Sequence, residues 1–417
     1  MGSLLSKPLT SKNVESLITT KLQCGSAEMH GYRIAMEDAH VLTPMPQARH
    51  ALLAGIFDGH NGADCSAYVA KKLQSVLLEE PKLPIDDEIM VDIVMNADKD
   101  YFMSGGEAGS TGVFAIFYPD EGEKSNNIDG KAGEIVANNL RVKTVNVGDS
   151  RAILWKSKDD ACISVTADHK PSNLSERNRI EASGGHVSAG RVNGDLAVSR
   201  AFGDFQFKNN RELPMEEQAV TTVPDIFDHA FEEGDIFILA CDGVFESNFS
   251  NEEVATFVAK NLKASKDPSW TACRLVDEAL HRGSKDNISC TIIWNKSNND
   301  EHEEPKAITG RFSIPGSYLP LVGNGNPGYR EGFEKMCIRG GVTPSMMIER
   351  RYAMLKAAAG HSEADPSWES LWEVVKDTCS PESGFEELDA ISDAVEGLDE
   401  QQRAEYFSAF WEKGGLM

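Results

Sequence analysis

Hydrophobic residues in the first three hundred positions gather in short runs rich in β-branched side chains, a pattern typical of buried strands. Such runs cover residues 51–57, 113–118, 140–147, 152–155, 236–241 and 288–294. Between some of them, apolar residues recur every three or four positions, which predicts helices over 63–79, 173–182, 251–262 and 270–282. Because strands dominate this mixture, we expect an α+β fold with an antiparallel β core and helices packed outside it.

The pattern changes near residue 295, where a polar stretch has the composition of a linker. A segment rich in glycine and proline follows as far as residue 341, and three helices are predicted beyond it, over 344–359, 366–378 and 399–413. The expected division is therefore an N-terminal segment (1–21), a main domain (22–294), a polar linker (295–306) and a C-terminal, mainly helical accessory domain (307–417).

The composition restricts what the chain can do. A formal net charge of −25 at neutral pH repels nucleic acid, so no nucleic-acid partner is expected. The sequence has no apolar run long enough to span a bilayer and no secretory signal, which predicts a cytoplasmic protein. The eight cysteines occur without a Cys-x-x-Cys pair, so neither a disulfide framework nor a structural zinc site is predicted.

The two ends of the chain carry separate signals. Residues 1–6 fit the N-myristoylation pattern, with Gly2 as the acceptor after removal of the first methionine. A single myristoyl chain would give only weak membrane association. At the other end, about half of the excess acid follows His361. This acidic part is either a solvated surface or, alternatively, a docking site for a basic protein partner.

Acidic residues recur where the predicted strands begin or end. Carboxylates held at the rim of a packed sheet would repel one another unless cations neutralised them, and Mg²⁺ and Mn²⁺ prefer such oxygen ligands. Gly59 and Gly243 permit sharp turns, in which a backbone carbonyl can serve as a further ligand. Spacing alone therefore indicates a candidate metal site, with Glu37, Asp38, Asp58, Asp149, Asp242 and Asp286 as its candidate residues.

Ten segments, in this order, resemble motifs of the metal-dependent protein phosphatase 2C family. They are 33–38, 58–60 (Asp-Gly-His), 109–112, 146–151, 168–171, 191–194, 196–204, 223–225, 241–243 (Cys-Asp-Gly) and 284–287. Together they cover about residues 22–294, and the chain beyond Lys296 lies outside them. The resemblance implies a central antiparallel β-sandwich flanked by helices on both sides, with two metal ions at one end of the sandwich.

The resemblance also implies the metal ligands. Asp58 would bridge two Mn²⁺ or Mg²⁺ ions. Glu37 and the Gly59 carbonyl would complete one site, whereas Asp242 and Asp286 would hold the other. Two bridged cations lower the pKa of a water molecule held between them, so no side-chain nucleophile is needed.

Three further residues would act at the substrate or at the bound water. Arg33 offers a fork of donors that fits phosphate oxygens. His60 would protonate the leaving serine or threonine oxygen, or is alternatively a structural histidine at a turn. Asp38 would accept a hydrogen bond from metal-bound water.

The sequence departs from the family pattern at two places. Asn61 stands between His60 and Gly62, a change that a turn tolerates. Glu246 stands where the family commonly has aspartate, which pairs with the counterpart of Asp149 at a third, weaker metal site. Because glutamate is one methylene longer, the geometry of that third site is open, and Asp149 is alternatively a turn residue only.

These observations predict a cytoplasmic phosphatase that hydrolyses phosphoserine and phosphothreonine in phosphoprotein substrates, with two Mn²⁺ or Mg²⁺ ions as cofactors. One alternative is a catalytically silent phosphatase fold that binds phosphoproteins as a scaffold, although such a scaffold would be expected to lose metal ligands. A metal-dependent nuclease is a second alternative, which the acidic surface disfavours.

Overall fold

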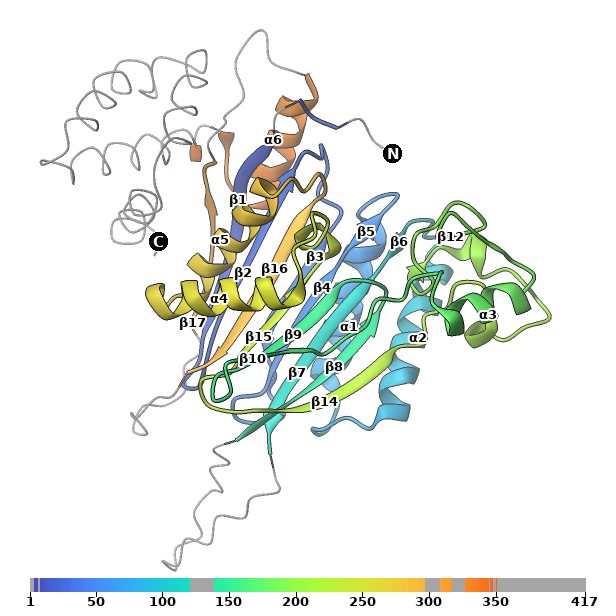
Figure 1. Cartoon of the computed structure of the whole chain (residues 1–417), viewed down its shortest axis with the longest axis horizontal. Coiled ribbons are helices and arrows are strands. Elements are labelled where there is room, and N and C mark those ends of the chain that lie inside the picture. Colours follow the sequence, from blue (N-terminus) through green and yellow to red (C-terminus); the bar gives the residue numbers. More distant parts are fainter. Residues whose placement is uncertain are drawn as a thin grey trace, which may run out of the picture.

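Two antiparallel sheets form the centre of the molecule (Figure 1). The computed structural model describes residues 4–6, 8–120, 139–296, 308–316, 327–344, 346–347 and 350. The larger sheet has seven strands in the order β10 (Ala161–Ser164), β9 (Arg151–Lys156), β15 (Ile236–Ala240), β16 (Ile288–Asn295), β2 (Leu22–Gly31), β1 (Leu9–Ile18) and β17 (Ile308–Ile314). The smaller sheet has five, in the order β14 (Asp225–Phe231), β8 (Leu140–Val147), β7 (Gly112–Pro119), β4 (Leu52–Phe57) and β3 (Ala39–Pro44).

The two sheets pack face to face around one buried cluster. Phe117 of β7 and Phe237 of β15 meet there with their ring centroids 5.4 Å apart and their planes nearly perpendicular. Every residue of β4 and β15 is buried, because helices cover the outer face of each sheet. Strands covered on both faces read as continuous apolar runs rather than as alternating ones. The predicted antiparallel sandwich flanked by helices on both sides is thus confirmed.

Four long helices form the two outer layers. Helices α1 (Asp64–Glu79) and α2 (Asp87–Met103) cover the smaller sheet, and α4 (Asn251–Ser265) and α5 (Pro268–His281) cover the larger one. Local sequence sets where they begin: Ser250 and Glu253 form a capping box before α4, and Asp267 accepts from two backbone N–H groups of α5. Three of these helices match predicted stretches, whereas α2 was not predicted.

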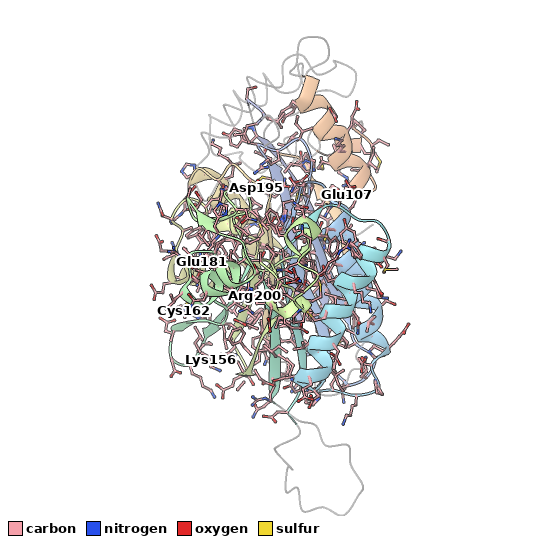
Figure 2. The ribbon with its side chains drawn as sticks, turned by 90° about the vertical axis from the view of Figure 1, so that its right-hand side faces the viewer. Glu107, Lys156, Cys162, Glu181, Asp195 and Arg200 are labelled. Atoms are coloured by element: carbon pink, nitrogen blue, oxygen red, sulfur yellow. The ribbon has the colours of Figure 1, made fainter. Side chains whose placement is uncertain are left out.

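A lobe extends from one end of the sandwich. It contains α3 (Leu174–Ala182), which matches its predicted range, and the short strands β11 (Val187–Ser188) and β12 (Arg191–Val192). A small core of its own, built from residues such as Ile180, Val192 and Val220, holds the lobe together. Figure 2 views the molecule from this side, and Glu181, Asp195 and Arg200 are labelled there.

The larger sheet includes strands from both sides of the predicted main domain. β1, which precedes residue 22, pairs with β2 and also with β17, so that Lys12 lies opposite Ile314. Helix α6 (Pro327–Arg339) adds Phe333, Met336 and Cys337 to the core beneath the larger sheet. The proposed division into domains stays a prediction, but residues 9–18 and 308–314 belong to the same sheet as residues 22–31.

Several sequence predictions lie outside the described residues. These are the myristoylation site at Gly2, most of the linker at 295–306, and the helices over 366–378 and 399–413, together with most of the one over 344–359.

Candidate metal centre

The register of the smaller sheet brings two of the predicted site residues together. Ala39, the first residue of β3, pairs with Phe57, the last of β4. Asp38 and Asp58 therefore leave neighbouring strands at the same end of the sandwich. The carbonyl of Asp58 accepts a hydrogen bond from the Thr111 N–H at 2.8 Å, which fixes the backbone as it turns.

The register of the larger sheet brings the other acids to that end as well. Ala240, the last residue of β15, pairs with Cys290 near the start of β16. Asp242 begins a 3₁₀ turn two residues after β15, and Asp286 lies two residues before β16. Glu37 lies in the loop that connects β2 to β3. Residues that are 250 positions apart, Glu37 and Asn287, hydrogen-bond here.

Mutual repulsion distinguishes this group of carboxylates. Burial raises the pKa of Asp58 well above its usual range, and the charges of Asp242, Asp38, Asp286 and Asp149 raise it further. Burial and the charges of Asp149 and Asp286 raise the pKa of Asp242 to about 8. Divalent cations would relieve this repulsion, so the donor set fits Mn²⁺ or Mg²⁺ by its chemistry.

The side chains do not form a closed cage. Among the described residues, no group of three or more His, Cys, Asp or Glu side chains has the arrangement of a metal site. Asp286 accepts a hydrogen bond from Arg33 Nη2 at 2.7 Å, and Asp149 forms an ion pair with Lys170. Metal binding would therefore require these side chains to exchange their present partners for the ion.

A close backbone approach fixes the two predicted ligands of the first site. A Cβ atom at Gly59 would overlap the carbonyl oxygen of Glu37, so only glycine fits there. Ser66 Oγ donates to the same carbonyl, and the Glu37 N–H donates to Asn287 Oδ1 at 2.9 Å. The Glu37 side chain and the Gly59 carbonyl thus stand on neighbouring backbone segments that hydrogen bonds hold in place.

Arg33 and Asp38 lie beside the carboxylate cluster. Arg33 is half-buried, and its Nε has no hydrogen-bond partner among the described residues. This buried, unpaired donor is available for a ligand oxygen. Asp38 is buried and accepts a hydrogen bond from Ser289 Oγ at 2.6 Å. Burial, together with the nearby charge of Asp286, raises the pKa of Asp38 to about 7.

His60 is paired with a carboxylate that the sequence analysis did not select. Its Nε2 lies 2.6 Å from Oδ2 of Asp204, whose side chain is fully buried. Burial opposes protonation of the imidazole, but the hydrogen bond and the charge of Asp204 outweigh it and raise the pKa of His60. Asp204 belongs to a family motif, but its pairing with a residue 144 positions away has no signal in one sequence.

Asn287 is a second residue that the sequence analysis missed. Its Nδ2 donates to the carbonyls of His30 and Ala35, at 3.1 Å and 2.9 Å, while its Oδ1 accepts from Glu37. One amide side chain therefore fixes both ends of the loop that carries Arg33 and Glu37.

The two residues of the predicted third site have different partners. Asp149 is buried against Lys170, whereas Glu246 is exposed and accepts from the Lys285 N–H at 2.9 Å and from Ser284 Oγ at 3.2 Å. The charge of Asp149 nevertheless acts on Asp242. A third ion at this place stays a prediction.

Comparison with known proteins identifies the family. The protein phosphatase 2C family model matches residues 22–288. The chain belongs to the protein phosphatase 2C family.

Relatives agree with this assignment. Protein phosphatase 2C homolog 2 of Saccharomyces cerevisiae is 34% identical over 291 residues, which cover 66% of this chain and 58% of the relative. Protein phosphatase 2C homolog 3 of Schizosaccharomyces pombe is 32% identical over 350 residues, covering 80% of this chain and 79% of the relative. The first of these matches thus spans little more than half of the relative's length.

A solved structure shows the same fold. The crystal structure of a phosphatase from a pathogenic strain of Toxoplasma gondii has a TM-score of 0.62 and 30% sequence identity, covering 71% of this chain and 99% of that one. Nearly the whole of that chain is thus matched by about seven tenths of this one.

Proposed function

We propose that the chain is a protein serine/threonine phosphatase that hydrolyses phosphoserine and phosphothreonine in proteins with the help of two Mn²⁺ or Mg²⁺ ions. One observation carries the proposal. Asp58, Asp242 and Asp286 converge at one end of the sandwich in surroundings that raise the pKa of each. Mutually repelling oxygen ligands of this kind suit divalent cations, which would neutralise them. Membership of the family supports the same conclusion.

The proposed ligands are Asp58 as the bridge, Glu37 and the Gly59 carbonyl on one side, and Asp242 and Asp286 on the other. When bound, the two cations supply Lewis-acid activation of a water nucleophile. The chain itself supplies the other functions: it binds the phosphate, orients it and delivers a proton.

Arg33 is the proposed phosphate-binding residue. Its guanidinium reaches Asp286 with Nη2, which leaves its buried Nε as a further donor for a phosphate oxygen. Asp38 lies at the same end and carries a raised pKa, so it can share a proton with water near neutral pH.

His60 is the proposed general acid. The carboxylate of Asp204 holds Nε2, so Nδ1 is the ring nitrogen that would donate to the leaving oxygen of serine or threonine. The raised pKa favours the protonated imidazole, which is the form that a general acid needs. Asp204 acts as a positioning residue because it orients the imidazole of His60 and favours its protonated form.

The scaffold alternative is not favoured, because every predicted metal ligand is present and Arg33 lies beside the site. Other predictions belong with the proposal. These are the cytoplasmic location, the acylation of Gly2, a third ion at Asp149 and Glu246, and a partner for the acidic C-terminal part. Within the described residues, none of the helices has the length and hydrophobicity needed to cross a membrane.

The test is hydrolysis of a phosphothreonine peptide by the full chain, with and without Mn²⁺, for the wild type, Asp58→Asn and Asp100→Asn. Asp100, on the surface of α2, pairs with Lys72 of α1 and serves as the matched control. Phosphate release that needs Mn²⁺, falls by about a thousandfold in Asp58→Asn and persists in Asp100→Asn is expected, since the metal pair stabilises the transition state by several kcal/mol. A folded wild type that releases no phosphate with Mn²⁺ or Mg²⁺ would contradict the proposal.

A further inference from the structure

Helix α6 lies outside the part of the chain that the family model matches, yet it touches the loop that carries the proposed catalytic residues. A Cβ atom at Gly332, in the second turn of α6, would lie 3.0 Å from the carbonyl oxygen of Ile34 and 2.6 Å from Leu9 Cδ1. The helix therefore packs directly on the backbone next to Arg33. Glycine suits this close approach, because a side chain here would crowd the Ile34 carbonyl and the Leu9 side chain.

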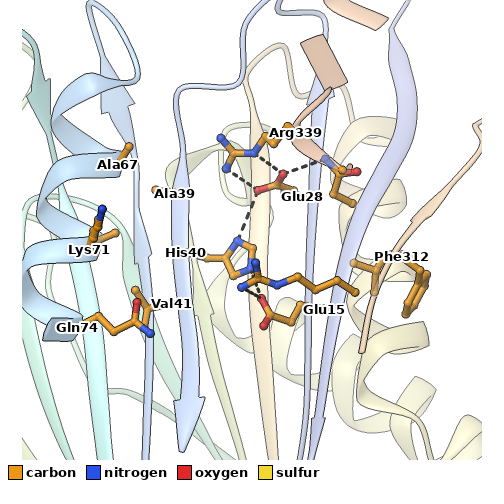
Figure 3. A pocket seen from close by; sticks show the side chains of 15 residues that line it. Glu15, Glu28, Ala39, His40, Val41, Ala67, Lys71, Gln74, Phe312 and Arg339 are labelled. Carbon is orange, nitrogen blue, oxygen red and sulfur yellow. Dashed lines mark hydrogen bonds and ion pairs between the residues drawn. The ribbon is translucent and has the colours of Figure 1, made fainter. Parts of the chain in front are cut away.

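The last residue of α6 makes a second contact with the same loop. Arg339 forms a fork on Glu28, with Nε at 2.5 Å from Oε1 and Nη2 at 2.7 Å from Oε2. The same Nη2 donates to the backbone carbonyl of Asp38 at 2.7 Å. Figure 3 shows the guanidinium beside Glu28, with His40 on the far side of that carboxylate. One planar group thus joins β2 to the residue that follows the proposed ligand Glu37.

The loop is held from two directions. Asn287 fixes Glu37 and Ala35 from the side of β16, and Arg339 fixes the carbonyl of Asp38 from the side of α6. The side chain of Asp38 is in turn bonded to Ser289. A shift of the Asp38 backbone would move this carboxylate and the neighbouring Glu37 together, because they are consecutive residues.

We propose that Arg339 is a positioning residue of the catalytic centre, which holds Asp38 and Glu37 in place through its bonds to the Asp38 carbonyl and to Glu28. The proposal rests on the proposed phosphatase function. It makes α6 part of the working enzyme, since the residue that braces the metal loop comes from a segment beyond the family match.

The surroundings of Arg339 provide a matched control. Arg339, Glu28, His40, Glu15 and Arg311 form a row of alternating charge along a cavity of about 330 Å³. Arg311, from β17, pairs with Glu15 at 3.1 Å and has a side chain that is 79% exposed. It therefore resembles Arg339 in charge, in pairing with a glutamate and in the cavity that it lines, but its ion pair is with Glu15, whereas Arg339 also bonds the Asp38 carbonyl.

The experiment compares the wild type, Arg339→Met and Arg311→Met in the full chain. Isothermal titration calorimetry gives Mn²⁺ affinity, peptide hydrolysis gives kcat and KM, and circular dichroism gives the melting temperature. We expect Arg339→Met to bind Mn²⁺ about tenfold more weakly and to lose about tenfold in kcat with little change in KM, as outer-shell partners of metal sites commonly do. Arg311→Met should keep its Mn²⁺ affinity, kcat and KM within about twofold of the wild-type values and should melt at nearly the same temperature.

A second variant separates the positioning role of Arg339 from the effect of leaving the buried Glu28 carboxylate without its arginine. Arg339→Met leaves the buried Glu28 with His40 and Asn13 but without its arginine, which can destabilise the fold. Glu28→Gln/Arg339→Met removes both charges but still leaves the Asp38 carbonyl without its Arg339 donor. The double variant should melt closer to the wild type while keeping the weak Mn²⁺ binding and low kcat. The proposal is overturned if either folded variant binds Mn²⁺ with wild-type affinity. It is also overturned if Arg311→Met loses as much Mn²⁺ affinity and kcat as Arg339→Met. A wild type that binds Mn²⁺ without hydrolysing the peptide would refute the phosphatase function, while the calorimetric comparison would still decide the role of Arg339.

Discussion

Two groups of carboxylates, one half-buried and one buried, lie in this molecule in opposite electrostatic surroundings. At the end of the sandwich, Asp58 and Asp242 face other acids, and the pKa of each is raised. Along the edge near α6, burial also acts to raise the pKa of Glu15 and Glu28, but hydrogen bonds and the charges of arginine and His40 outweigh it and lower both values. Burial alone therefore does not identify a functional acid. A functional acid is identified instead by the lack of a positively charged partner, because a bound cation would supply that charge.

The paired group should be the one that stabilises the fold. Glu28→Ala would leave Arg339 without the carboxylate that it grips and His40 with Glu15 alone, so we expect the free energy of unfolding to fall by about 3 kcal/mol. Chemical denaturation followed by circular dichroism measures this change. Asp277→Ala is a comparison, since Asp277 of α5 is the half-buried partner of Lys12 in β1. If Glu28→Ala has the same unfolding free energy as the wild type, the pairing of Glu28 in this row of charges does not stabilise the fold.

The paired group should also make stability depend on pH in a defined window. Burial alone would lower the pKa of His40, but hydrogen bonds to Glu15 and Glu28 raise it from 6.5 to about 9. Because the folded state binds this proton more tightly, the stabilisation is complete below pH 6.5 and is lost as the pH rises through 9. We expect about 2 kcal/mol to disappear over this interval in the wild type.

The control for this pH effect is His40→Gln. The variant lacks the titrating group, so its unfolding free energy should change less between pH 6.5 and pH 9.5. Equal slopes for the two proteins would show that His40 does not gain its proton on folding.

A paired carboxylate inside the site offers a sharper comparison. Asp204→Asn keeps the left-handed backbone at this position, which asparagine tolerates, but removes the charge beside His60. Without that charge the pKa of His60 falls, so the alkaline limb of the kcat profile should move to lower pH. We expect kcat at pH 8 to fall by about tenfold.

The measurement for Asp204→Asn is the pH profile of kcat with Mn²⁺ saturating. A uniform loss at every pH would indicate a structural defect rather than loss of the protonated acid. Asp225→Asn provides a control, since Asp225 is the carboxylate that pairs with His169, a histidine with no proposed catalytic role.

The smallest effect is expected in the repelling group, and its sign is opposite to that of Glu28→Ala. In metal-free protein, Asp58→Asn removes one of several like charges, so the unfolding free energy should rise by about 1 kcal/mol. Adding Mn²⁺ should stabilise the wild type and leave the variant nearly unchanged. Melting temperatures measured in a chelator and in Mn²⁺ test both statements, and destabilisation of metal-free Asp58→Asn would break the comparison.

The difference between the two groups of carboxylates also explains which parts of the fold and the site could be predicted from the sequence. Strands covered on both faces appear in the sequence as apolar runs, and the acids at their ends are visible as Asp58 and Asp242. The paired group gives no such signal. Glu28 lies in β2, a strand of mixed composition that is buried because β1, β16 and α5 surround it.

Pairings between distant segments were beyond the reach of one sequence for the same reason. Nothing in the residues around His60 indicates Asp204, and nothing near Glu28 indicates Arg339, because each contact depends on the tertiary fold. Family resemblance supplied the proposed roles of the acids, but it ended before β17 and α6.

The pairing of β1 with β17 also sets the order in which the sheet can be completed. β1 is synthesised about three hundred residues before β17, yet one of its edges is covered only when Ile314 has appeared opposite Lys12. At ribosomal rates of about 5–20 residues per second, that edge would stay open for roughly 15–60 seconds. An unpaired strand edge is a template for unwanted association. The newly made N-terminal strand therefore depends on the arrival of a segment about three hundred residues later for its protection.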